Sequence, residues 1–128
     1  MEVGTSYARG KNAEALALQY LKKQGLKLVA QNYVPPGRGM ADLDLIMQAK
    51  DGTLIFIEVK SRKGRDYGGA AASVSLSKQK RLILSAQHYL MQLRVPPVCR
   101  FDVILWEGDE LQHQKPVWIQ GAFVANIY

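Results

Sequence analysis

The chain has 128 residues, of which 48% are hydrophobic and 22% charged, and this composition is typical of a globular rather than a disordered protein. Its length predicts a single domain, residues 1–128, around one core. The 17 Lys and Arg exceed the 11 Asp and Glu and give a formal net charge of +6. A basic excess of this size favours an anionic partner, either nucleic acid or an anionic membrane surface.

The cysteine content and the N-terminal segment indicate the cellular compartment in which the protein is expected. Cys99 is the single cysteine, which excludes a disulfide within the chain and fits a reducing environment. It lies in the apolar stretch PPVCRFDVILW, where a small buried side chain is expected rather than a nucleophile. The segment MEVGTSYARGKNAE lacks the apolar region of a signal peptide, and no apolar run reaches the ~20 residues that span a bilayer. We therefore expect a cytoplasmic protein with no membrane partner.

Two segments have the spacing of amphipathic helices. The first covers residues 6–24 and ends before Gly25, a typical helix stop. The second begins at a cap formed by Ser75 or Ser77 and runs to about Leu93. Its predicted inner face consists of five apolar residues: Leu82, Ile83, Ala86, Leu90 and Leu93.

Five segments are predicted to be strands. They are residues 26–33, the two arms of a hairpin within 41–62, and residues 98–106 and 116–124. Loops at 34–40 and 63–73 separate them, because both segments are rich in residues that interrupt regular structure. The order α-β-β-β-α-β-β predicts an α/β fold with a mixed sheet of about five strands flanked by helices.

The hairpin, ADLDLIMQAKDGTLIFIEVKSR, carries four charged residues inside its apolar arms: Asp42, Asp44, Glu58 and Lys60. Side chains alternate between the two faces of a strand. Asp42 and Asp44 therefore share one face of the first arm, and Glu58 and Lys60 share one face of the second. Whether the two charged faces coincide depends on the turn between the arms.

Two turns are compatible with the sequence. A two-residue turn at 51–52 would place Asp44 opposite Val59 and split the charges between the faces. A three-residue turn at 50–52, with Gly52 left-handed, would place Asp44 opposite Glu58 and Asp42 opposite Lys60. Sequence alone leaves both registers open.

The second register predicts a cation site. Directly opposed carboxylates repel by roughly 3 kcal/mol at ~5 Å and an effective dielectric of ~20. A divalent cation would relieve this repulsion, and Mg²⁺ favours one or two carboxylates together with water and phosphate oxygens. Glu14, at the border of the buried face of the first helix, could approach the same cluster.

Simpler interpretations stay open for each acidic residue alone. Asp42 could end the preceding loop, Glu58 and Lys60 could be an exposed pair on an edge strand, and Glu14 could be an ordinary helix acid. Asp44 is harder to dismiss, because it lies within an apolar strand fourteen residues before Glu58.

The spacing D…(x13)…E-V-K resembles the PD-(D/E)xK nuclease superfamily. More closely, the segments GKNAEALALQYLKKQGLKLVAQNY, ADLDLI, LIFIEVKSR, KQKRLILSAQHYL and RFDVILW resemble the YraN-like family of small bacterial proteins. That family is itself similar to archaeal Holliday-junction resolvases. The resemblance covers about residues 10–123 and implies a restriction-endonuclease-like fold.

The resemblance also implies roles for individual residues. Asp44 and Glu58 correspond to the metal ligands, with Mg²⁺ as the cofactor and Mn²⁺ as a substitute. Lys60 corresponds to the residue that positions or activates water, and Glu14 becomes an accessory acid. The chain departs from the usual G-E-I-D-L-I at Ala41 and Asp42, which leaves the role of Asp42 undefined.

Five basic residues are candidates for contacts with a nucleic-acid backbone: Lys63, Arg65, Lys78, Lys80 and Arg81. The first two lie on the glycine-rich loop and the others begin the second helix, where N–H groups also attract phosphate. Ordinary solvation is the alternative for each. Arg100 and Asp102 share a strand face and are expected to pair with each other.

Together these features predict a Mg²⁺-dependent endonuclease that hydrolyses phosphodiester bonds in DNA, with branched or otherwise structured DNA as the substrate. One alternative is a nucleic-acid-binding module that keeps the fold without turnover, and another is a structural adaptor. The intact D…E-x-K favours the enzyme, because neither alternative needs the lysine beside the carboxylates. Resolvase-like action would imply a homodimer, by analogy of fold.

Overall fold

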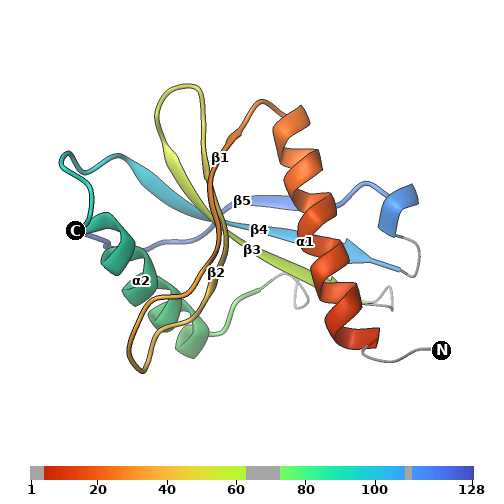
Figure 1. Ribbon diagram of the computed structural model, residues 1–128, viewed down its shortest axis with the longest axis horizontal. Coiled ribbons are helices and arrows are strands. Elements are labelled where there is room, and N and C mark those ends of the chain that lie inside the picture. Colours follow the sequence, from red (N-terminus) through yellow and green to blue (C-terminus); the bar gives the residue numbers. More distant parts are fainter. Residues whose placement is uncertain (1–4, 63–72, 109–110) are drawn as a thin grey trace.

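The structure is a computed structural model that describes residues 5–62, 73–108 and 111–128 (Figure 1). Its elements, in chain order, are α1 (Thr5–Lys23), β1 (Lys27–Tyr33), β2 (Leu43–Gln48), β3 (Leu54–Arg62), α2 (Leu76–Leu90), β4 (Cys99–Glu107), the short 3₁₀ helix η2 (Leu111–His113) and β5 (Val117–Phe123). The strands form one sheet in the order β1-β2-β3-β4-β5. The predicted α/β fold with a mixed five-strand sheet is confirmed, and it is consistent with a restriction-endonuclease-like fold.

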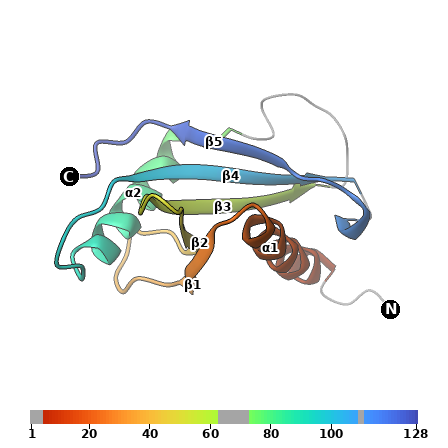
Figure 2. The ribbon, with the colours of Figure 1, turned by 90° about the horizontal axis from the view of Figure 1, so that it is seen from above.

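One parallel strand pair determines where the helices lie. β3 and β4 are parallel, whereas the other neighbouring strands are antiparallel. Parallel neighbours require a crossover connection, and the connection from β3 to β4 contains α2. α2 packs on one face of the sheet and α1 on the other, as the two views show (Figures 1 and 2).

Helix α1 covers its face of the sheet with a stripe of small and apolar side chains. Ala13, Ala17 and Leu21 follow one another at a spacing of four residues, and all three are buried. The helix ends where Gly25 takes a positive φ of 100° and the Leu26 N–H donates to the Leu21 carbonyl, which caps the last turn. Neither described helix has the long apolar run needed to cross a membrane.

Helix α2 is preceded by Ser75, whose side chain accepts a hydrogen bond from the Lys78 backbone N–H at 3.1 Å. Ser75, rather than Ser77, is therefore the cap. The helix ends at Leu90, three residues before the predicted end, and Leu82, Ala86 and Leu90 are buried against the sheet. The predicted inner residues Ile83 and Leu93 are only partly buried at the edge of the same cluster.

The β2–β3 hairpin has the three-residue turn. Leu45 lies opposite Ile57 and Gln48 opposite Leu54. The Ala49 N–H donates to the Thr53 carbonyl at 2.9 Å, and Gly52 has a φ of 93°. These values fit a left-handed glycine in a three-residue turn, and they exclude the two-residue turn. Continued by one position beyond the Leu45–Ile57 pair, this register sets Asp44 opposite Glu58, although the paired positions themselves end at Leu45.

The alternation predicted for the first hairpin arm fails at its beginning. Leu43 packs in the α2-side cluster, whereas Leu45 packs on the α1 side. Asp42 is exposed and precedes β2, so it is not a strand residue facing Lys60, as the three-residue register had predicted. The cause is a change in hydrogen bonding at Asp44, which also shapes the candidate site.

Candidate metal-dependent active site

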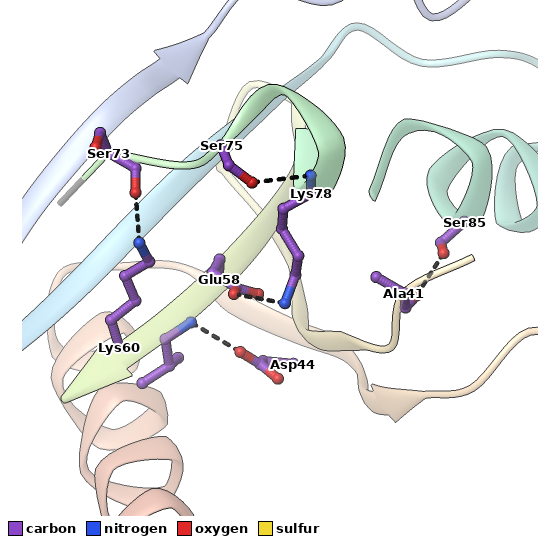
Figure 3. Close-up of polar contacts among 9 residues, drawn as sticks. Ala41, Asp44, Glu58, Lys60, Ser73, Ser75, Lys78 and Ser85 are labelled. Atoms are coloured by element: carbon purple, nitrogen blue, oxygen red, sulfur yellow. Dashed lines mark hydrogen bonds and ion pairs between the residues drawn. The ribbon is translucent and has the colours of Figure 1, made fainter. Parts of the chain in front are cut away.

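Asp44 replaces one bond of the β2–β3 ladder with its side chain. In this register the next ladder bond after the Leu45–Ile57 pair would join the Val59 N–H to the Leu43 carbonyl. The Val59 N–H instead donates to Asp44 Oδ2 at 2.8 Å (Figure 3). The two strands therefore cease to pair at Asp44, and its carboxylate is fixed beside β3.

The segment before β2 is held by helix α2. The Ala41 N–H donates to the Arg81 carbonyl at 3.3 Å, and the Ala41 carbonyl accepts a hydrogen bond from the Ser85 hydroxyl. Both groups come from α2, so this helix also positions the start of the hairpin. Ala41, which stands where the resembling family has glycine, has no positive φ, and its methyl group is buried in the core. A side chain is therefore tolerated at this position.

The surroundings of Asp44 disfavour its charged form. Burial, followed by the nearby charge of Glu58, raises the pKa of Asp44 from 3.8 to about 7, and Glu14 adds to the rise. The hydrogen bond from Val59 and the charge of Lys78 lower this pKa, but they do not cancel the rise. Two neighbouring carboxylates thus act on Asp44, and a cation bound here would favour its charged form.

Two lysines partner the other two acids. Lys78 Nζ lies 3.2 Å from Glu58 Oε2, and the Glu58 side chain is only 13% exposed. Lys11 Nζ lies 3.8 Å from Glu14 Oε1 one turn earlier on α1. The ammonium group described next to Glu58 therefore comes from α2, and not from the lysine of the E-V-K sequence.

Lys60 extends toward a different part of the chain. Its ammonium group donates to the Ser73 carbonyl at 2.5 Å, and Figure 3 shows the side chain reaching from β3 toward Ser73. Lys60 does not belong to the described residues that line the cleft over Asp44 and Glu58. In this conformation its nitrogen binds the segment that leads into α2.

The cleft has a volume of about 480 Å³ and lies between α1, the start of the hairpin and α2. Its polar lining consists mainly of charged side chains: Glu14, Asp42, Asp44, Glu58, Lys78 and Arg81. The structure thus brings together both predicted metal ligands, the accessory acid and two of the predicted DNA contacts. Lys80 is exposed and is not one of the described lining residues, and Lys63 and Arg65 lie outside the described residues.

The donor set fits a hard cation. Asp44 and Glu58 offer carboxylate oxygens from neighbouring strands, and Mg²⁺ needs only one or two carboxylates when water and phosphate complete its coordination. Within residues 5–62, 73–108 and 111–128, no three or more His, Cys, Asp or Glu side chains form a group arranged to hold a metal. Asp44 and Glu58 are therefore a pair of carboxylates in the cleft, with Glu14 as a further acid from α1.

Asp102 lies in the core and not in the cleft. Asp102 on β4 is 1% exposed, and its oxygens accept hydrogen bonds from Arg100 Nε, Trp118 Nε1 and the Gly121 N–H, all at 2.9 Å. The predicted Arg100–Asp102 pair is confirmed. Its further contacts join β4 to β5, so Asp102 stabilises the sheet.

Sequence reasoning missed two contacts that shape the site. The Glu58–Lys78 pair joins residues twenty positions apart on separate elements, and no local pattern predicts it. Arg9 of α1 donates to the carbonyls of Arg62 and Gly108, at 2.9 and 2.5 Å, and so fixes α1 to the ends of β3 and β4.

Cys99, expected to be buried, is only partly buried, and its burial raises the pKa of the thiol.

The fold and the cleft define a small α/β domain that gathers carboxylates from a β-hairpin beneath a basic helix. The chain belongs to the uncharacterised protein family UPF0102, whose family model matches residues 13–106. This confirms the resemblance to the YraN-like proteins.

The relatives are similar over most of their own length. A UPF0102 protein of Albidiferax ferrireducens is 51% identical over 124 residues, which are 97% of this chain and 93% of the relative. Another, from Cupriavidus taiwanensis, is 51% identical over 93% of this chain and 85% of its own. A third, from Methylibium petroleiphilum, is 45% identical over 95% of this chain and 98% of its own.

Proposed function

We propose that this protein is a Mg²⁺-dependent endonuclease that hydrolyses phosphodiester bonds in DNA, with branched or otherwise structured DNA as its substrate. The observation that carries the proposal is that Asp44 and Glu58, from neighbouring strands, line one cleft, with the pKa of Asp44 raised by burial and by Glu58. Lys78 offsets this repulsion only in part, because the pKa of Asp44 stays raised despite the neighbouring ammonium group.

Asp44 and Glu58 would hold the metal, which when bound would polarise the scissile phosphate and lower the pKa of a water molecule. The Val59 N–H keeps the Asp44 carboxylate in one orientation, so little reorganisation is needed during the reaction. Lys78 and Arg81 line the same cleft from α2, where they would bind phosphate oxygens of the DNA backbone. Glu14 adds negative charge from α1 and strengthens the preference for a cation.

Lys60 would orient the attacking water and stabilise the charge that develops in the transition state. To do so, its ammonium group must exchange the Ser73 carbonyl for the water. The ammonium group would then donate to the water in place of the carbonyl. This contact also favours the second candidate function, a nucleic-acid-binding module without turnover, in which Lys60 keeps Ser73 as its partner. Resolvase-like action on a junction would require two copies of the chain.

The test is a panel of four-way, flapped, nicked and linear DNAs incubated with Mg²⁺ or Mn²⁺. Asp44→Asn removes the charge but keeps an oxygen that accepts the Val59 hydrogen bond. Asp51→Asn, in the exposed turn of the same hairpin, is the matched control. Cleavage by the parent and by Asp51→Asn, but not by Asp44→Asn, is the expected result. Binding without cleavage would select the module.

A further inference from the structure

The ammonium group of Lys78 lies where it would compete with a bound metal ion for Glu58. Its ammonium group lies 3.2 Å from Glu58 Oε2, above a carboxylate that is only 13% exposed, while the Lys78 side chain itself is 34% exposed. The first turn of α2 is fixed by the Ser75 cap, so the lysine enters the cleft from a defined point (Figure 3). Lys78 thus supplies a positive charge directly at the acidic pair.

This ammonium group and a divalent cation would compete for the same oxygen atoms. Glu58 must give its oxygens to the cation, and a cation at that position repels a neighbouring ammonium group. Displacement from Glu58 leaves Lys78 in the cleft, whose lining also includes Arg81 of the same helix. The displaced charge is then available to an approaching phosphate.

We infer that Lys78 exchanges partners, from Glu58 in the metal-free protein to a phosphate of the nucleic-acid backbone when a divalent cation binds at Asp44 and Glu58. Metal uptake and backbone binding are then coupled through one side chain. The inference rests on the cation site of the proposed function, but it does not require that the protein cut its substrate. It gives Lys78 a role different from that of Lys60, which contacts Ser73.

The experiment measures Mn²⁺ affinity and DNA affinity separately. Lys78→Met removes the ammonium group and keeps the aliphatic stem, whereas Lys78→Arg keeps the charge. Lys22→Met is the matched control, because Lys22 is exposed in the last turn of α1 and does not belong to the described lining of the cleft. Circular dichroism and thermal melts verify the fold of each variant.

Calorimetric titration with Mn²⁺, without DNA, is expected to show about tenfold tighter binding for Lys78→Met, since a competing charge has been removed. Lys22→Met should stay within about twofold of the parent, because exposed distant charges are screened. Lys78→Arg should also stay close to the parent. Binding to a four-way DNA junction is then compared in Ca²⁺ and in EDTA. Lys78→Met should weaken it about tenfold in Ca²⁺, but only about twofold in EDTA, where the lysine is already paired.

The outcomes separate the two claims. The exchange of partners is overturned if the parent binds Mn²⁺ and Lys78→Met binds it with the same affinity. It is also overturned if Lys78→Met loses the same amount of DNA affinity in Ca²⁺ and in EDTA. If the Mn²⁺ and DNA affinities change as expected but the protein cuts none of the DNAs, the exchange of partners is supported and only the proposed nuclease activity is overturned. A parent that binds no Mn²⁺ overturns both.

Discussion

The carboxylate of Asp44 should make the metal-free protein less stable at neutral and alkaline pH. Its pKa is raised from 3.8 to about 7 in the folded protein, first by burial and then by Glu58. Folding therefore favours the protonated form. Below pH 3.8 both states carry the proton and the penalty is absent. As the pH rises toward 7, the unfolded chain has lost its proton while the folded protein keeps it, and stability falls.

The size of the effect follows from the two pKa values. The difference between 3.8 and about 7 corresponds to a penalty of about 4 kcal/mol in unfolding free energy at pH 8. Asp44→Asn removes the charge and keeps an acceptor for the Val59 N–H. Because an amide is itself costly to bury, we expect a net gain of about half that value, about 2 kcal/mol. For a domain of this size the gain raises Tm by about 8 °C.

The assay is thermal unfolding in EDTA, followed by circular dichroism at pH 4 and pH 8. Asp44→Asn should melt higher than the parent at pH 8 but lower than the parent at pH 4, where the penalty on the charge is nearly absent and the cost of the buried amide remains. The control Asp51→Asn should not melt higher at pH 8, because the Thr53 N–H lowers the pKa of Asp51 and its charge is not penalised. A gain for Asp44→Asn that is equal at both pH values, or a loss at pH 8, would refute the reasoning.

Three further changes test other parts of the structure. Lys60→Ala should keep or raise Mn²⁺ affinity in calorimetry while cleavage falls by about two orders of magnitude, as for other lost electrostatic stabilisers; cutting at the parental rate would make Lys60 a surface charge. DNA affinity should fall steeply between low and moderate salt in a fluorescence titration, because a chain of net charge +6 releases counterions from several phosphates; a flat response would indicate a protein partner. Ser75→Ala should lower the unfolding free energy in urea by about 1 kcal/mol through loss of the α2 cap, whereas Ser77→Ala, at an exposed position two residues further on, should change it little.

Much of the fold could be predicted because its boundaries depend on local chemistry. Gly25 ends α1 within one residue of the expected position, and Gly52 allows the three-residue turn that sets Asp44 opposite Glu58. The sequence did not decide between the two turns, since Asp51 and Gly52 suit both. The structure selected one through the Ala49–Thr53 hydrogen bond and the φ of Gly52.

The parts of the site that escaped prediction depend on contacts between distant elements. Asp42 leaves the strand because Asp44 takes the Val59 N–H and interrupts the ladder. Lys78 reaches Glu58 because the crossover lays α2 over the hairpin, which a spacing pattern along one strand cannot reveal. The alternation of side chains along a strand therefore identified the acidic pair. It also selected Lys60 as the lysine beside the pair, because Lys60 is close in sequence, whereas the structure has Lys78 of α2 beside Glu58.

The central claim is that Asp44 and Glu58 hold a divalent cation with which the protein cuts DNA. The most direct measurement is single-turnover cleavage of an end-labelled four-way junction in Mg²⁺, comparing the parent with Glu58→Gln. We predict cleavage by the parent that EDTA abolishes, and a loss of at least about 100-fold in Glu58→Gln. Cleavage that survives EDTA, or that Glu58→Gln retains at the parental rate, would contradict the account.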